Sequence, residues 1–260
     1  MHALRSLFCI LFIFSVCLAA KETITFPSKD KLTITADVYI AHADSTAPFI
    51  LLCHQAGWSR GEYLEIAPKL NAMGFNCMAI DQRSGKGVNE VSNKTAAAAK
   101  AKALAMDYPD ALPDIIAAIE YAKTHYAKGK IIVWGSSYSS ALVLKLGGDM
   151  ASDIDGVLSF APGEYFTRFG KPKDWIRQSA AKITGPVFIT SAKSEHVNWK
   201  AIYDAIPSEQ KQYFLPQTKG NHGSRALWDK FKDSEEYWKA VSDFLGQFLT
   251  KTDAADKMEG

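Results

Sequence analysis

Short apolar runs alternate with helical patterns along most of the chain, and this alternation constrains the fold more than any other feature. A strand that is apolar along its whole length is buried on both faces, which is typical of a parallel sheet with helices on both sides. Residues 32–40 instead alternate with a period of two, as in an antiparallel strand. The strands expected in chain order are 32–40, 48–54, 75–81, 130–135, 154–162, 185–192 and 211–218.

Helical patterns separate these runs. The first contains an apolar stripe and stops at Gly74, because glycine commonly ends a helix. The last places Trp238, Val241, Leu245 and Phe248 on one face. The other expected helices are 111–126, 139–148, 173–182 and 201–206. The sequence therefore predicts an α/β fold with a mostly parallel sheet covered on both faces.

The chain has 260 residues, of which 47% are hydrophobic, enough for one domain with a large core. We expect a single domain over 21–260, with no internal repeat or linker. Residues 84–110 form a long connection that contains an Ala/Lys helix without a strong apolar stripe. This segment is interpreted either as a lid over a site or as a solvated surface helix.

Residues 1–20 have the pattern of a secretory signal peptide: a short basic start, an apolar stretch and small residues at its end. We therefore expect cleavage near Ala19 or Ala20 and a secreted or periplasmic protein. An uncleaved anchor is the main alternative, and a lipoprotein site at Cys17 is less favoured because Val16 precedes it. Cys53 and Cys77 lie in different predicted strands and out of register, so two buried free thiols are expected.

Charge gives little indication of a macromolecular partner. The formal net charge is +2, which indicates neither a nucleic-acid nor an anionic-membrane partner. No cysteine lies in a metal-ligand motif, and no metal site is expected. The oligomeric state stays open.

The sequence GSSYS at 135–139 follows a predicted strand and precedes a helix. Chemistry in an open parallel sheet gathers at the carboxyl ends of its strands. A nucleophile on such a turn needs small residues two positions before and after it, as in G-x-S-x-G. Gly135 and Ser139 satisfy this spacing around Ser137, which predicts Ser137 as the nucleophile. The alternative is a serine-rich helix cap without catalytic function.

A serine nucleophile needs a base, and the base needs an orienting acid. His222 lies in a Gly-rich loop after the last predicted strand, in the order Ser, acid, His. Glu195 follows the strand 185–192 and is the predicted acid, with Glu164 as the fallback. A surface charge without a catalytic role is the other interpretation of Glu195.

Two N–H donors are needed to stabilise an oxyanion. We expect the N–H groups of Tyr138, directly after the nucleophile, and of Gln55, in the loop after 48–54. His54 is expected to organise that loop rather than to act as a base. His54, Trp58 and Tyr165 are weaker candidates for lining the substrate pocket, because most aromatic side chains belong to the core.

The motifs GSSYS, HQAG, DQRSG, SAKSE and GNHG, in chain order with SAKSE before GNHG, resemble those of the α/β-hydrolase fold superfamily. The compact size is similar to its dienelactone-hydrolase-like and small serine esterase branches. The resemblance covers about 22–250 and implies an eight-stranded, mostly parallel sheet and a Ser–His–acid triad without metal or organic cofactor. Within DQRSG, Asp81 and Arg83 resemble a structural turn of the family.

The leading hypothesis is a serine hydrolase that cleaves carboxylic esters of small molecules through an acyl-enzyme on Ser137. A thioesterase, a lactone hydrolase or a peptidase with the same triad is the alternative, because the sequence does not define the pocket. A non-catalytic binding protein on this fold is a third hypothesis. It is separated from the others by the distance between Ser137 and His222.

Overall fold

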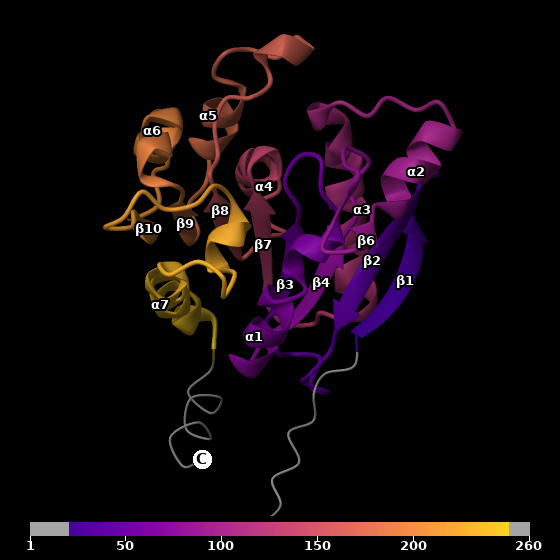
Figure 1. Ribbon diagram of the computed structural model, residues 1–260, viewed down its shortest axis with the longest axis horizontal. Helices are drawn as coiled ribbons and strands as arrows, with labels where there is room; N and C mark the ends of the chain where they lie inside the picture. The colour runs from indigo at the N-terminus through magenta and orange to yellow at the C-terminus, as the bar shows by residue number, and fades with distance from the viewer. Residues whose placement is uncertain (1–20, 250–260) are drawn as a thin grey trace, which may run out of the picture.

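The computed structural model describes residues 21–249, and its centre is a sheet of eight strands in the order β1-β2-β4-β3-β7-β8-β9-β10. Figure 1 shows this order across the sheet, from β10 at one edge to β1 at the other. The strands of this sheet are β1 (Lys21–Pro27), β2 (Thr33–Tyr39), β3 (Phe49–Cys53), β4 (Asn76–Ile80), β7 (Ile131–Ser136), β8 (Gly156–Phe160), β9 (Val187–Thr190) and β10 (Lys211–Phe214).

The directions of the strands follow the sequence pattern. From β4 to β10 every neighbouring pair is parallel, whereas β2 pairs antiparallel with both β1 and β4. The predicted fold class is confirmed. Strand β1 is the one that the hydrophobic pattern did not reveal. It lies at the edge of the sheet, where Phe26 is its only buried residue, so its sequence carries little apolar signal.

Helices cover both faces of the sheet. Alternate side chains of the same strand enter different cores: Leu51 and Cys53 face the layer with α3 and α4, whereas Ile50 and Leu52 face α1 and α7. Within 21–249 the α-helices are α1 (Ile66–Ala72), α2 (Lys94–Ala101), α3 (Leu112–His125), α4 (Tyr138–Asp149), α5 (Trp175–Ala180), α6 (His196–Ala205) and α7 (Ser234–Leu245).

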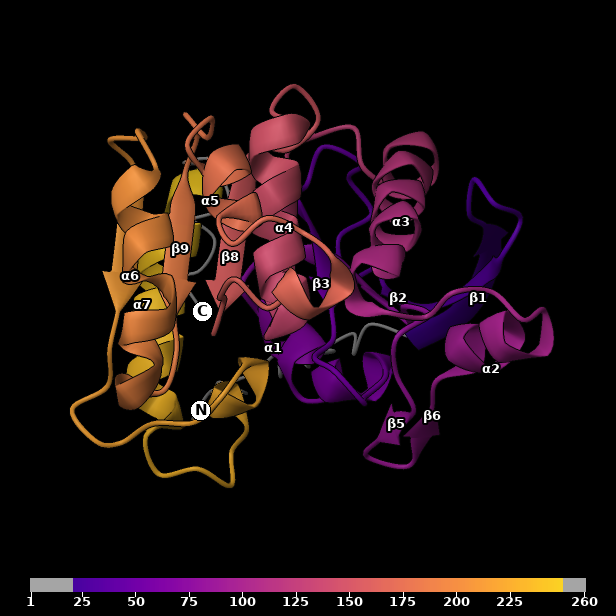
Figure 2. The same ribbon diagram turned by 90° about the horizontal axis from the view of Figure 1, so that it is seen from above.

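The connection 84–110 folds as a small hairpin followed by α2. Its strands are β5 (Gly87–Val88) and β6 (Val91–Ser92). Figures 1 and 2 both place α2 at the β1/β2 side of the molecule, opposite α6 and α7. Thr95 in α2 accepts a hydrogen bond from Thr35 N (2.8 Å), and Ala99 is fully buried, so α2 packs on β2 as part of the layer.

Both cysteines of the described region are buried and free, as predicted. On the adjacent strands β3 and β4, Cys53 pairs with Ile80 and Cys77 with Ile50. The two thiols therefore lie three positions out of register. The predicted signal peptide, 1–20, lies outside the described residues. Within the described part, no helix is both long and apolar enough for a membrane span.

Buried ion pairs hold the connections that leave the sheet. Arg60 contacts Asp81 (2.7 Å) and Asp37 (2.9 Å). Arg83 donates to the fully buried Asp114 through Nη2 (2.6 Å) and through its backbone N–H (2.8 Å). Asp81 and Arg83 therefore act structurally, as the family resemblance implied.

Replacing Asp114 by Ala leaves the buried guanidinium of Arg83 without its main partner. We expect Asp114→Ala to lower the free energy of unfolding by about 3–5 kcal/mol. Asp153→Ala is the matched control, because Asp153 pairs with Lys123 at the surface, where a pair contributes about 1 kcal/mol or less. Urea unfolding followed by circular dichroism measures both values. Equal losses in the two variants would contradict the structural role of the Arg83–Asp114 pair.

Candidate active site

Ser137 lies on the sharp turn between β7, which ends at Ser136, and α4, which begins at Tyr138. Its backbone has φ 58° and ψ −120°, in the left-handed half of φ space that residues with a side chain rarely adopt. A Cβ at Gly135 would lie 2.4 Å from the carbonyl oxygen of Ser139, so only glycine fits there. Local strain of this kind is typical of a nucleophile held on a strand-to-helix turn.

Ser139 occupies the position of the second glycine of the motif, and its hydroxyl becomes part of the turn. Its Oγ accepts the N–H of Ser136 (3.0 Å) and lies within hydrogen-bond distance of the carbonyls of Cys53 (2.7 Å) and His54 (2.9 Å). These contacts connect the turn at Ser137 to the end of β3. A serine therefore fits at this position because its hydroxyl is fully buried and hydrogen-bonded.

The structure brings Ser137, His222 and Glu195 together from three separate loops. Nε2 of His222 lies 2.8 Å from Ser137 Oγ, and Nδ1 lies 2.5 Å from Glu195 Oε1. With the hydroxyl donating to Nε2, the proton of the neutral ring is on Nδ1, which donates to Glu195. Such a geometry allows His222 to accept the proton of Ser137 while Glu195 fixes the ring. The short Ser137–His222 distance favours an enzyme over a binding protein.

Glu195, rather than Glu164, contacts His222. Glu195 ends the 3₁₀ turn η4 (Lys193–Glu195) after β9, and its second oxygen accepts the N–H of Ala192 (3.1 Å). The oxygens of Glu164 accept the N–H groups of Ile176 (3.0 Å) and Arg177 (2.9 Å) at the start of α5. Glu164 thus caps a helix.

One of the two expected oxyanion donors is placed differently. Tyr138 is the first residue of α4, and no acceptor among the described residues contacts its N–H. The N–H of Gln55, in contrast, donates to Oε2 of the buried Glu62 (2.8 Å). Because that N–H points to a carboxylate, the expectation for Gln55 is wrong. The next residue, Ala56, is partly exposed, and its N–H contacts no acceptor within 21–249.

A hollow of about 340 Å³ lies next to Ser137. Tyr165 lines it, as expected, and donates its hydroxyl proton to Ala161 O (2.7 Å). Tyr108 extends from the end of the connection 84–110, stacks on Tyr138, and lies beneath the guanidinium of Arg168. The connection therefore contributes one aromatic side chain to the site, although its helix α2 packs elsewhere.

His54 and Trp58 do not line this hollow, contrary to expectation. His54 is fully buried, where its Nε2 accepts the N–H of Gln82 (3.0 Å) and its Nδ1 faces Gln55 O (2.8 Å). It therefore organises the loop after β3. Trp58 stacks on Trp228, with ring centroids 5.2 Å apart. Hydrophobic packing between loops explains this position better than contact with a substrate.

Sequence reasoning missed a buried carboxyl group beneath the site. Glu62 is in the 3₁₀ turn η1 (Arg60–Tyr63) and is fully buried. Its Oε1 accepts the hydroxyl proton of Ser136 (2.7 Å), next to the nucleophile. Burial raises the pKa of Glu62 to about 7, against the opposing effects of its hydrogen bonds and of Arg225. The pattern gave no signal, because a glutamate before α1 is ordinary on the polar face of a helix.

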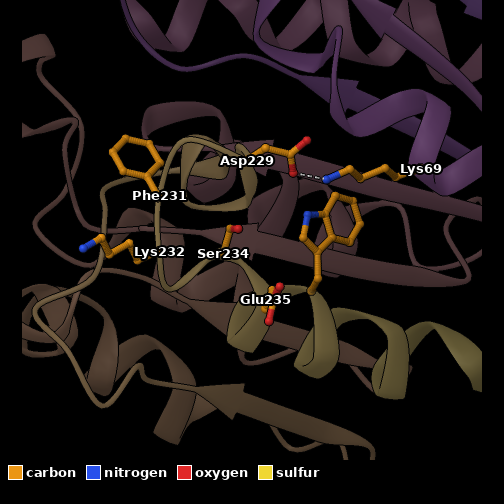
Figure 3. A pocket seen from close by; sticks show the side chains of 7 residues that line it. Lys69, Asp229, Phe231, Lys232, Ser234 and Glu235 are labelled. Carbon is orange, nitrogen blue, oxygen red and sulfur yellow. Dashed lines mark hydrogen bonds and ion pairs between the residues drawn. The ribbon is translucent and has the colours of Figure 1, made fainter.

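A second hollow, of about 530 Å³, lies between α1 and the start of α7 (Figure 3). Lys69 pairs with Asp229 there, and the ammonium group lies over the ring of Trp238. This hollow shares no residue with the one at Ser137. Among residues 21–249, no cluster of His, Cys, Asp or Glu has an arrangement that would hold a metal ion.

Comparisons with known proteins agree with this architecture. A family model described as serine aminopeptidase, S33, matches residues 44–168. No curated protein matches the sequence significantly.

Several solved structures share the fold at low sequence identity. A dienelactone hydrolase from Anabaena variabilis has a TM-score of 0.69 at 11% identity, over 90% of this chain and all (100%) of that one. The Pyrococcus furiosus esterase Pf2001 has a TM-score of 0.66 at 16% identity, over 89% and 94%. A cold-adapted esterase from an Arctic intertidal metagenomic library has a TM-score of 0.63 at 18% identity, over 90% and 96%.

The raised pKa of Glu62 makes stability depend on pH. The folded protein holds this proton up to about pH 7, whereas an unfolded glutamate loses it near 4.5. The stability that this proton contributes is therefore complete below about pH 4.5 and is lost as pH rises through 7. Relative to Glu62→Gln, we expect the wild-type free energy of unfolding to fall by up to about 3 kcal/mol between pH 4.5 and 8. Urea unfolding of both proteins across this range measures the difference, and parallel pH profiles would contradict it.

Proposed function

The chain belongs to the α/β-hydrolase superfamily and is a serine hydrolase, and from this premise we propose that it cleaves carboxylic esters with Ser137, His222 and Glu195 as its triad. The observation that supports this most strongly is the continuous contact from Ser137 Oγ to His222 (2.8 Å) and from His222 to Glu195 (2.5 Å). A serine hydroxyl becomes a nucleophile when a positioned base takes its proton.

In the proposed first step, Ser137 Oγ attacks the carbonyl carbon of the ester, and its proton moves to Nε2 of His222. Glu195 stabilises the imidazolium that forms. The N–H groups of Tyr138 and Ala56 donate to the oxyanion, Ala56 replacing the Gln55 of the sequence-based hypothesis. When the carbon–oxygen bond of the ester breaks, His222 returns the proton to the departing alcohol, which leaves an acyl group on Ser137.

In the second step water replaces the alcohol. His222 takes a proton from the water as its oxygen attacks the acyl carbon, and the same two N–H groups hold the second oxyanion. The bond to Ser137 then breaks, and His222 returns the proton to the serine oxygen. The products are a carboxylic acid and the regenerated enzyme, and no metal or organic cofactor takes part in the proposed cycle.

The hollow beside Ser137 supports a small substrate. Its volume of about 340 Å³ and its aromatic side chains, Tyr108, Tyr138 and Tyr165, suit a compact acyl or aryl group. Similarity to proteins described as esterases and as a dienelactone hydrolase supports an ester or a lactone.

Peptide hydrolysis is the second candidate, because the matched family model is described as serine aminopeptidase. An amino-terminal substrate needs an acidic group near the nucleophile to pair with its ammonium. Glu164 lines the hollow, but both of its oxygens accept N–H groups of α5. This arrangement favours the ester. A panel of esters, thioesters, lactones and aminoacyl amides separates the candidates by their kcat/KM values.

A fluorophosphonate probe tests the nucleophile. We expect the wild type to be labelled at Ser137 and Ser137→Ala not to be labelled, and we expect both Ser137→Ala and His222→Ala to lose kcat/KM for p-nitrophenyl acetate by about 10⁴-fold or more. Ser152→Ala is the control, because Ser152 is exposed and distant in sequence from the three loops. Folded wild type that resists the probe, or label on another serine, would overturn the proposal.

Export is also part of the proposal. Residues 1–20 have the composition of a secretory signal, and we propose that the protein functions in the periplasm or outside the cell. N-terminal sequencing of the protein recovered from an exporting host is expected to start near Lys21. A start at Met1 would contradict cleavage, and a lipid on Cys17 would indicate the anchored alternative.

A further inference from the structure

Four buried residues connect the three loops that meet at Ser137, and we call them the Glu62 network: Glu62, Gln55, Ser136 and Ser224. Oε2 of Glu62 accepts the N–H of Gln55 (2.8 Å), and Oε1 accepts the hydroxyl proton of Ser136 (2.7 Å). The oxygen of that hydroxyl accepts the N–H of Ser224 (2.9 Å). Glu62, Ser136 and Ser224 are fully buried and Gln55 is 7% exposed, so water does not compete for these bonds.

Each donor in this network is next to a group of the proposed machinery. Gln55 directly precedes Ala56, and Ser136 directly precedes Ser137. Ser224 lies two residues after His222, at the start of the 3₁₀ turn η5 (Ser224–Leu227). A single carboxyl group therefore connects the backbone of the oxyanion loop, the nucleophile turn and the histidine loop.

The loops are also too close for a looser arrangement. Gly223, between His222 and Ser224, has φ +70°, and a Cβ there would lie 2.5 Å from Ser136 Oγ and 2.8 Å from Gln55 Oε1. That Oε1 is buried and has no hydrogen-bond partner among the described residues. Unpartnered buried oxygens destabilise a fold, so this junction is maintained at some cost in stability.

We propose that Glu62 is a positioning residue for the hydrolysis: its two oxygens fix the Ala56 loop directly and the His222 loop through Ser136, relative to Ser137. This inference rests on the proposed function. Glu62 touches no reacting atom. It acts on the alignment of the base and the oxyanion donors, and errors of about 1 Å in such alignment reduce rates by about 100-fold.

The chemistry of the network requires a carboxyl group. Two oxygens accept two donors from different loops, whereas an amide offers one oxygen and one NH₂ group. With glutamine at 62, either the Gln55 N–H or the Ser136 hydroxyl proton loses its acceptor. Because no water reaches the site, the loops must shift to satisfy the freed donor.

A purely structural role makes a different prediction from a positioning role. If Glu62 only stabilises the fold, its replacement lowers stability and the fraction of active protein but leaves kcat per active site unchanged. If it positions the machinery, kcat and kcat/KM fall together, while KM changes little because no substrate contact is lost.

The test compares Glu62→Gln with Glu65→Gln, a control three residues away, whose carboxylate contacts only Asp229 N at the surface. Hydrolysis of p-nitrophenyl acetate is measured and normalised to sites titrated with a fluorophosphonate. We expect kcat of Glu62→Gln to fall about 10- to 100-fold with KM within twofold, and Glu65→Gln to match the wild type. A kcat per site within twofold of the wild type in Glu62→Gln would overturn the inference.

Ser136→Ala is the second variant, and it keeps the test decisive if Glu62→Gln folds poorly. It removes the connection to Ser224 and is expected to lower kcat about 10-fold, with little further loss in the double variant, because both residues act through one chain of contacts. Wild-type kcat in Ser136→Ala, or additive losses, would overturn the network. Wild type without ester turnover and without label on Ser137 would instead refute the proposed function.

Discussion

The backbone of Ser137 is the constraint on which the site depends. A residue with a side chain is held at φ 58°, a conformation that costs about 1–3 kcal/mol and persists only when its surroundings impose it. The surroundings are visible. The N–H of Ser137 donates to Phe160 O (2.7 Å) on β8, and Ser139 joins the turn to the end of β3. Two neighbouring strands thus hold the turn from both sides, and the parallel sheet supplies the energy for its strained geometry.

Much of this arrangement could be predicted from the sequence, and the reason is physical. Buried parallel strands must be apolar along their length, so β3, β4, β7, β8 and β9 were all identified by composition alone. The roles proposed for Ser137, His222 and Glu195 follow from position, because each residue comes after the carboxyl end of a strand. Those ends meet at one edge of the sheet, whatever the sequence distance between them.

The features that sequence reasoning missed depend on contacts between loops. Strand β1 has one buried residue and hence almost no hydrophobic signal. The direction of the Gln55 N–H depends on Glu62, seven residues later, whose burial no periodicity reveals. Burial of a carboxylate is rare, and it requires donors from other loops, here Gln55 and Ser136. Such a group becomes visible only when all the loops are in place.

The two free cysteines have a consequence for the life of the chain outside the cell. Burial raises the pKa of both thiols, so neither is a thiolate at physiological pH, and their register keeps them apart in the folded sheet. The unfolded chain has neither protection. In an oxidising compartment a disulfide between Cys53 and Cys77 would join β3 to β4 in a wrong register and block the central sheet. Folding must therefore finish before oxidation, and the rate at which a thiol reagent reacts becomes a measure of how often the centre of the sheet opens.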